Sequence, residues 1–165
     1  MRELSSFRVQ PAFAVPPHLT ALHGAVAGWM LDAPGALVQF IEPAKGTVEV
    51  ANWLVGEVYQ LLDGCFPKRN DLVLVLDLHM MVGRTAAARS IFLNSARVLG
   101  KRFANVYVVA PAAYPPIYVH AFQASLAFAR LLGIRVTVAA SSAQLLERYR
   151  WSPLGASAPA LAASV

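Results

Sequence analysis

The chain has 165 residues, a length typical of one domain, and 57% of them are apolar while only 14% are charged. Its single cysteine, Cys65, excludes an internal disulfide and favours a reducing, cytoplasmic compartment, and no unbroken apolar run is long enough to predict a transmembrane segment. The net charge of +5 comes from the second half, because residues 78–165 carry nine Lys or Arg against one acid.

The first part of the chain is predicted to form an arm and a hairpin. Residues 1–23 contain several prolines and no sustained periodicity, so we expect an extended N-terminal arm with a short strand near Phe7–Val9. Between Trp29 and Ile41, two apolar stretches flank an Asp, a Pro and a Gly, which are turn-forming residues. This segment is therefore predicted to be a β-hairpin.

A helix and a buried strand are predicted after the hairpin. Thr47 is suited to cap a helix whose apolar residues recur at helical spacing, and Gly64 is suited to the left-handed position just past its end. The segment Asp71–Asp77 encloses five consecutive apolar residues. Such a run is too short for a helix and is typical of a strand that is buried on both faces.

The rest of the chain alternates helices with strands. A loop over His79–Arg84 leads to a helix that Thr85 caps and Gly100 closes, followed by a strand over 105–109, a helix over 115–132, a strand over 134–138 and a helix over 142–150. This alternation predicts an α/β fold, a single mainly parallel sheet with an N-terminal antiparallel hairpin and helices packed on it. We expect one domain over residues 24–150 and a flexible Ala/Ser/Pro-rich tail over residues 151–165.

The predicted elements, together with several sequence segments, resemble those of a known protein family. It is carried by the strand Leu72–Leu78, the loop into Thr85, the helix Ala86–Leu99, the strand Val106–Val109 and the helix-to-strand join Leu131–Val138. In this pattern the chain resembles a STAS domain, the SpoIIAA-like fold that is shared in outline with lipid-binding CRAL-TRIO domains.

The resemblance implies a non-enzymatic switch that binds a partner protein. Many STAS domains are controlled by phosphorylation of a serine in an Asp-Ser-Ser-Gly motif, at the start of the helix that follows the Asp-Leu strand. The comparable place here is Gly83–Ala87, which lacks this motif and has Thr85 as its nearest hydroxyl. The departure argues against a phosphorylation switch and fits a divergent bacterial protein of SpoIIAA-like or CRAL-TRIO type.

A candidate ligand or anion site lies beyond the 71–77 strand and consists of Asp77, His79, Gly83, Arg84 and Thr85. Open α/β sheets bind ligands at the carboxyl ends of their strands. Asp77 and His79 could share a strand face, whereas Arg84 beside a helix N-terminus favours an anion. Thr85 is also explained as a plain helix cap, and no third group orients Asp77 and His79 for catalysis. We therefore predict no catalytic residue, and the absence of metal-ligand spacings and phosphate-loop motifs predicts no metal and no cofactor.

The predicted helix near Tyr114–Leu132 is apolar nearly all round, with Arg130 as its only charged residue. Either the N-terminal arm buries this helix, or its outer face meets a second copy of the chain or a lipid surface. The candidate partner contacts are Tyr118, Phe122, Phe128 and Arg130.

Three functions stay open at this point. The first is a protein-interaction or regulatory module of STAS-like type that self-associates through the apolar helix. The second is a carrier of a small apolar ligand or lipid that resembles CRAL-TRIO domains and requires an internal cavity. The third is a small enzyme that uses Asp77 and His79. The basic second half could attract an acidic partner, whereas no nucleic-acid-binding motif is present.

Overall fold

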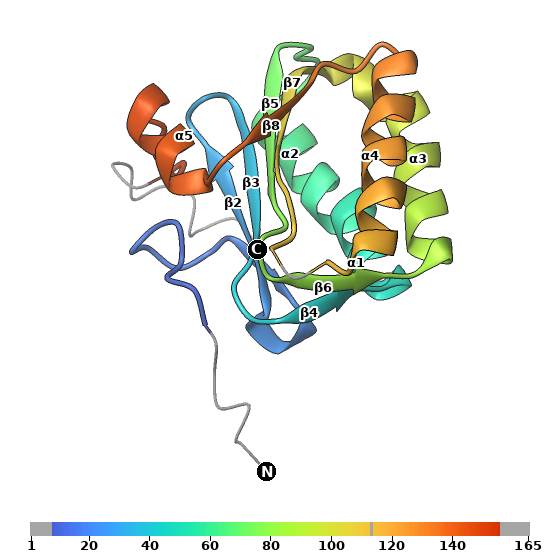
Figure 1. Cartoon of the computed structure of the whole chain (residues 1–165). Helices are drawn as coiled ribbons and strands as arrows, with labels where there is room; N and C mark the ends of the chain where they lie inside the picture. The colour runs from blue at the N-terminus through green and yellow to red at the C-terminus, as the bar shows by residue number, and fades with distance from the viewer. Residues whose placement is uncertain (1–7, 113, 156–165) are drawn as a thin grey trace.

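The computed structural model describes residues 8–112 and 114–155, and it confirms the predicted α/β fold. Six strands form one sheet in the order β1-β2-β3-β5-β7-β8 (Figure 1). The first three strands are antiparallel neighbours, and β3, β5, β7 and β8 run parallel to one another. The strands are β1 (Leu19–Ala21), β2 (Val26–Leu31), β3 (Gly35–Phe40), β5 (Leu72–Asp77), β7 (Phe103–Val109) and β8 (Val136–Ala139).

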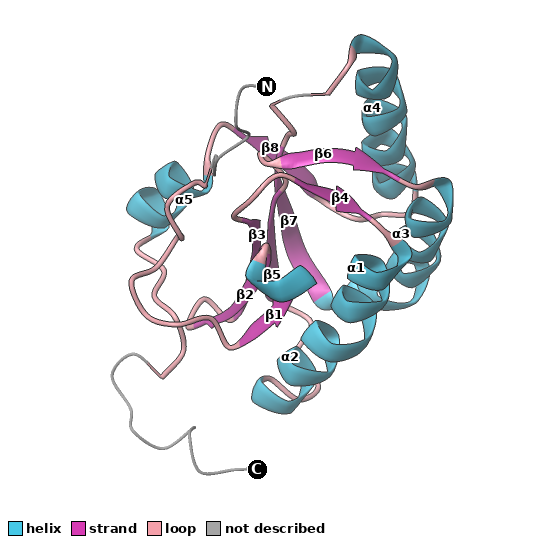
Figure 2. Ribbon diagram, turned by 90° about the horizontal axis from the view of Figure 1, so that it is seen from below, coloured by secondary structure: helices cyan, strands magenta, loops and turns pink. Residues whose placement is uncertain are grey.

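The helices are divided unequally between the two faces of this sheet. A continuous helix made of α1 (Val48–Trp53), a π-helical segment (Leu54–Val58) and α2 (Tyr59–Cys65) covers one face together with α3 (Ala86–Leu99) and α4 (Pro116–Leu131). The short α5 (Ser142–Tyr149) lies on the other face (Figure 1). A second, two-stranded parallel sheet of β4 (Ala44–Gly46) and β6 (Met81–Arg84) lies beside the main one (Figure 2). The sequence predicted only a loop where β6 forms.

The hairpin of β2 and β3 is the most deeply buried part of the molecule, because every one of its strand residues is buried. On the helix-bearing face, Val26 and Met30 of β2 belong to the larger hydrophobic core, to which α1 and α2 contribute Trp53 and Leu62. On the opposite face, Trp29 belongs to a smaller core onto which the N-terminal arm packs Phe13, with the two rings 5.7 Å apart. This described segment of the arm therefore covers β2 on the face of the sheet opposite α4.

The helix caps predicted at Thr47 and Thr85 are present, and of the two serines that could cap the last helix, Ser141 and Ser142, Ser141 does so. The hydroxyl oxygens of Thr47, Thr85 and Ser141 accept hydrogen bonds from backbone N–H groups three residues further along the chain. Each bond satisfies a donor that a helix N-terminus otherwise leaves unpaired. Gly133 follows α4 with a φ of +82°, a left-handed conformation that glycine adopts without strain.

Gly64 does not take the helix-ending position that the sequence predicted for it. Phe66 packs against the larger core, and its N–H donates to the carbonyl of Leu62, so the helix continues through Cys65 and leaves Gly64 inside it. The left-handed residue of this turn is Lys68, with a φ of +59°.

Near each end of the described part of the chain, backbone hydrogen bonds join the chain to the β2–β3 hairpin. The N–H of Val9 donates to the carbonyl of Ile41 without forming a strand, and Phe7 lies outside the described residues. At the other end, Pro153 forms a β-bridge with Leu31, and neighbouring backbone groups bond on either side of it. The described beginning of the predicted tail is thus tied to β2, and residues 156–165 lie outside the described part.

The contact of Gly35 with β5 predicts a large loss of stability in the variant Gly35→Ala. A Cβ atom at Gly35 would lie 2.0 Å from the carbonyl oxygen of Val73, which belongs to the neighbouring strand backbone and cannot give way. We expect the free energy of unfolding to fall by about 3 kcal/mol or more, measured by urea denaturation. A loss below about 1 kcal/mol would contradict this register.

The helical position of Gly64 predicts the opposite outcome for Gly64→Ala. A Cβ atom there meets no atom within 4 Å, and alanine lowers the entropic cost of ordering the helix. We expect the same measurement to show stabilisation by about 0.5–1 kcal/mol. Destabilisation would indicate instead the left-handed backbone that the sequence predicted.

Candidate functional site

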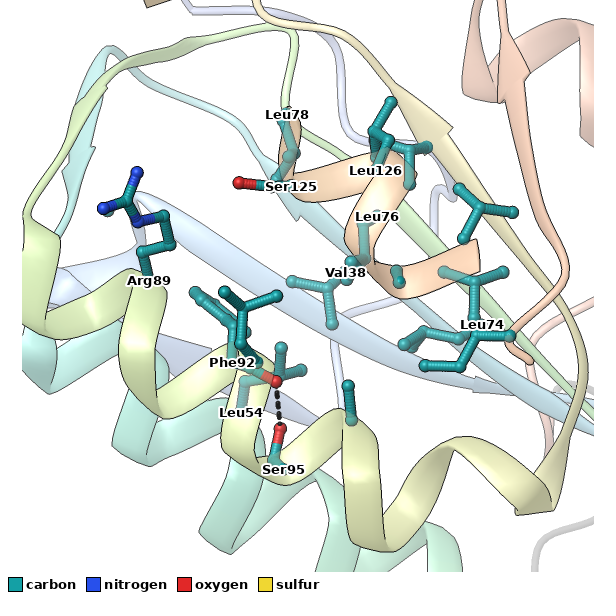
Figure 3. Close-up of a pocket in the computed structure, with 18 of the residues that line it drawn as sticks. Val38, Leu54, Leu74, Leu76, Leu78, Arg89, Phe92, Ser95, Ser125 and Leu126 are labelled. Atoms are coloured by element: carbon teal, nitrogen blue, oxygen red, sulfur yellow. Dashed lines mark hydrogen bonds between the residues drawn. The ribbon is translucent and has the colours of Figure 1, made fainter. Parts of the chain in front are cut away.

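An apolar cavity of about 160 Å³ lies between the helix-bearing face of the sheet and the inner sides of α3 and α4. The sheet contributes mainly aliphatic side chains to it, and the helices contribute one aromatic residue each together with smaller residues. Those drawn in Figure 3 include Val38, Leu54, Leu74, Leu76, Phe92, Ser95 and Leu126. An apolar cavity of about this volume in another protein admits a benzene-sized molecule. The cavity therefore has room for one ring or a short hydrocarbon chain.

Small residues on two facing helices leave this space open. Ser95 and Ala96 line the cavity from α3, and Ser125 and Ala129 line it from α4. The two serine hydroxyls donate to backbone carbonyls of their own helices, at Phe92 and Ala121, so neither needs a partner across the cavity. Leucine or phenylalanine at these positions would fill the space. The sequence analysis did not predict the cavity. The one pattern that could have indicated it is the recurrence of small residues beside large apolar ones, at helical spacing, in α3 and α4.

Positively charged groups stand at one end of the cavity. Arg84 at the end of β6 and Arg89 on α3 both line it, and Arg89 is exposed, so its part of the lining meets the surface. Figure 3 shows Arg89 at one end of the labelled lining residues. The Nη2 atom of Arg84 donates to Oγ of Ser125 on α4, 3.0 Å away. Arg84 thereby joins β6 to α4 by a hydrogen bond.

The surroundings of Arg84 do not compensate its charge. Burial lowers the pKa of its guanidinium from the ordinary value; Tyr114 opposes this shift, and the nearby positive charge of Arg89 adds to it. Within the described part of the chain Arg84 forms no ion pair, and no Asp or Glu is among the described residues that line the cavity. The hydroxyl of Tyr114 is buried without a hydrogen-bond partner; burial raises its pKa, and the charge of Arg84 opposes that rise.

The predicted pair of Asp77 and His79 lies apart from this cavity. Alternation along β5 directs Leu74 and Leu76 to the cavity and Asp77 to the opposite face. There the carboxylate of Asp77 accepts a hydrogen bond from Oγ of Ser142, 2.6 Å away, and another from the backbone N–H of His79. The exposed His79 ring is not its partner, so the two side chains form no dyad. Asp77 instead fastens the start of α5 to the end of β5.

Gly83 and Thr85 flank Arg84, but their contacts are strand pairing and helix capping and do not involve the cavity. Gly83 pairs with Lys45 in the small sheet. The N–H of Thr85 donates to the carbonyl of Gly46, and its hydroxyl caps α3. Of the five residues predicted around this loop, only Arg84 lines the cavity.

The candidate partner contacts on α4 point in different directions. Phe122 is buried and lines the cavity, so a partner cannot reach it in this structure. Phe128 is partly covered by Arg97 of α3, whose guanidinium lies 5.9 Å from the ring centre. Tyr118 is exposed, and Arg130 donates to the carbonyl of Val136 on the edge strand β8.

No known protein family, curated protein or solved structure matches this chain. The resemblance to STAS domains therefore stays a prediction from the sequence. None of the helices that the structure describes combines the length and the apolarity needed to cross a membrane. Among the same residues, no group of three or more His, Cys, Asp and Glu side chains is arranged to hold a metal ion.

The contact between Asp77 and Ser142 predicts a structural effect of Ser142→Ala. The substitution leaves one oxygen of a buried carboxylate without its donor, and we expect the free energy of unfolding to fall by about 1–3 kcal/mol in urea denaturation. The control is Ser90→Ala, which removes an exposed serine hydroxyl from α3 and should change stability by less than about 0.5 kcal/mol. Equal effects of the two substitutions would contradict the structural role of Asp77.

Proposed function

We propose that this protein binds a small apolar or amphipathic molecule in the cavity beneath α3 and α4. The observation that carries the proposal is the cavity itself, which is lined almost wholly by apolar side chains and opens beside Arg89. A binding site for a small molecule is commonly a concave apolar space with a few convergent polar groups. The carrier function that the sequence left as an alternative required such a cavity.

The energetic cost of the cavity supports a binding role over a packing defect. Apolar side chains that line an unfilled space lose the dispersion contacts that close packing would give them, which costs stability. A bound molecule would restore the lost contacts and stabilise the folded state by mass action.

The same geometry weighs against the small enzyme that the sequence left open. Asp77 is engaged by Ser142 and by the backbone of His79, on the face of the sheet away from the cavity. The described polar groups at the cavity mouth are two guanidinium groups and a hydroxyl that is already bonded to its own helix. Guanidinium groups bind and orient anions well, but they stay protonated and make poor general bases.

Filling the cavity tests this proposal. We expect Ala96→Leu to weaken the binding of octan-1-ol at least about tenfold in isothermal titration calorimetry, because the leucine occupies the space beside Phe92. The matched control is Ala87→Leu, the same substitution at an exposed position of the same helix, which should leave binding unchanged. Native mass spectrometry of gently purified protein should also detect a retained apolar molecule. If the unsubstituted protein does not bind octan-1-ol, the proposal fails.

Self-association is a second candidate function, favoured by the outer side of α4. Ile117 is 75% exposed and Leu131 is 84% exposed, and Tyr118 lies between them on the same helix. The neighbouring edge strand β8 adds Val138, which is also exposed. Apolar, self-complementary surfaces commonly form two-fold contacts. This candidate agrees with the partner-binding role that the STAS resemblance implies.

A charge on this surface tests self-association. We expect the unsubstituted protein to sediment as a dimer in analytical ultracentrifugation and Leu131→Glu to sediment as a monomer, because a carboxylate cannot be buried there without a partner. The control is Val82→Glu, which places the same charge at an exposed position of β6. Monomeric behaviour of the unsubstituted protein over the whole concentration range would exclude this function.

A further inference from the structure

We propose that the ligand of this cavity is an amphiphile with one anionic head, a carboxylate or a phosphate, which Arg84 and Arg89 bind at the mouth. The inference rests on the proposed apolar-ligand function and adds the chemical class of the ligand. Its starting point is that Arg84 is the most enclosed charged group at the cavity and has no acidic counterpart among the described residues.

The position of Arg84 places its charge where a ligand would enter. The side chain starts on β6, and its hydrocarbon stem passes beside Gly46 of β4, where a Cβ atom would lie 3.5 Å from the Arg84 Cγ and 3.0 Å from the Met81 sulfur. The stem of Arg84 would lie at ordinary contact distance from such a Cβ atom, whereas the Met81 sulfur would be crowded by it. The guanidinium then reaches Ser125 on α4. Together with Arg89 on α3, it places positive charge beside both helices that roof the cavity.

The hydrogen bonds of Arg84 leave most of its donors available. A guanidinium carries five N–H groups, and the structure gives that of Arg84 one side-chain partner, the Ser125 hydroxyl. Two guanidinium groups near each other, one of them partly buried, repel unless an anion lies between or beside them. A carboxylate or phosphate matches this fork of donors and can accept two parallel N–H bonds. The unusual pairing of like charges at an apolar cavity is thereby explained by the ligand.

The cavity itself limits the rest of the ligand. Beyond the two arginines its lining consists of aliphatic and aromatic side chains and of serine hydroxyls bonded to their own helices. Two of the aromatic residues carry polar atoms, the Tyr59 hydroxyl and the Trp53 indole N–H, and the latter is buried without a hydrogen-bond partner. A second charged group deep in the cavity would find no oppositely charged partner among these residues and would be costly to bury. The apolar part is limited to about the size of one ring or a short chain. Short-chain carboxylates and alkyl phosphates satisfy these conditions.

The test compares ligands that share a chain and differ in the head. We expect isothermal titration calorimetry to show octanoate binding at least about tenfold more tightly than octan-1-ol, because only octanoate can form charge-assisted hydrogen bonds. Arg84→Gln keeps most of the side-chain length and a donor for Ser125 but removes the charge, so this variant should bind octanoate no more tightly than octan-1-ol. Arg84→Lys should retain part of the preference, and Arg89→Ala should reduce it less, because Arg89 is exposed.

Two controls separate the site from general attraction to a basic protein. Arg135→Ala removes one exposed positive charge elsewhere in the chain and should leave the preference for octanoate intact. Octyl phosphate should bind much more tightly than inorganic phosphate, because the cavity contributes to the affinity only when an alkyl chain is present. The ratio of the affinities for octanoate and octyl phosphate then shows whether the two arginines bind a carboxylate or a phosphate more tightly. Circular dichroism establishes that each variant is folded.

The outcomes distinguish this inference from the function on which it rests. If octan-1-ol and octanoate bind equally well and Arg84→Gln alters neither, the anionic head is excluded and the apolar-ligand function stands. If inorganic phosphate binds as tightly as octyl phosphate, the mouth holds an anion without using the cavity, and the inference is wrong. If neither eight-carbon compound binds the unsubstituted protein, the proposed function and the inference fail together.

Discussion

The burial of the β2–β3 hairpin on both faces is the constraint on which the rest of this structure depends. Every strand residue of the hairpin is buried, so each face needs its own cover. The continuous α1–α2 helix provides one cover, and the N-terminal arm with the described chain end provides the other. Because these segments are used at the hairpin, the helix-bearing face of β5 and β7 depends on α3 and α4 for its cover (Figure 1). That division of cover decides where a cavity can form.

The cavity and the arginines at its mouth have a common structural origin in the small β4–β6 sheet. This sheet carries the chain across from the main sheet to the N-terminus of α3, and its last residue is Arg84. The hydrogen bond from Arg84 to Ser125 links this small sheet to α4. The same side chain therefore holds α4 in place over the cavity and puts a positive charge at the cavity mouth. Small residues on the inner sides of α3 and α4 then keep the helices from filling the space below them. An apolar ligand with an acidic head fits both features at once.

The candidate site was only partly predictable from the residues. Arg84 could be singled out as an anion-binding group from its place beside a helix start, and that group does line the cavity. The sequence did not show that Asp77 and His79 lie apart from Arg84. Asp77 is the last residue of β5, and the alternation of side chains along that strand directs it to the face of the sheet away from the cavity. Asp77 is held by Ser142, which lies 65 residues further along the chain. No local sequence pattern predicts a contact between residues so far apart in the chain. The exposure of α4 was hidden for the same reason, since nothing local to its apolar sequence specifies that the arm covers the opposite face.

The sequence by itself determined the alternation of strands and helices, the parallel sheet with its antiparallel hairpin, the helix starts at Thr47 and Thr85, and the start of the last helix to within one residue, at Ser141 or Ser142. These features follow from apolar periodicity and from side chains that satisfy backbone groups within a few residues, so they are local. Only the tertiary structure decided that Gly64 lies inside a helix, that β6 forms in the predicted loop, and that α3 and α4 roof a cavity. Each of these depends on packing between segments distant in sequence: Phe66 against the core, β6 against β4, and small helix residues facing the sheet. A linear pattern specifies how much apolar surface must be buried, whereas the space that remains unfilled depends on how all the elements meet.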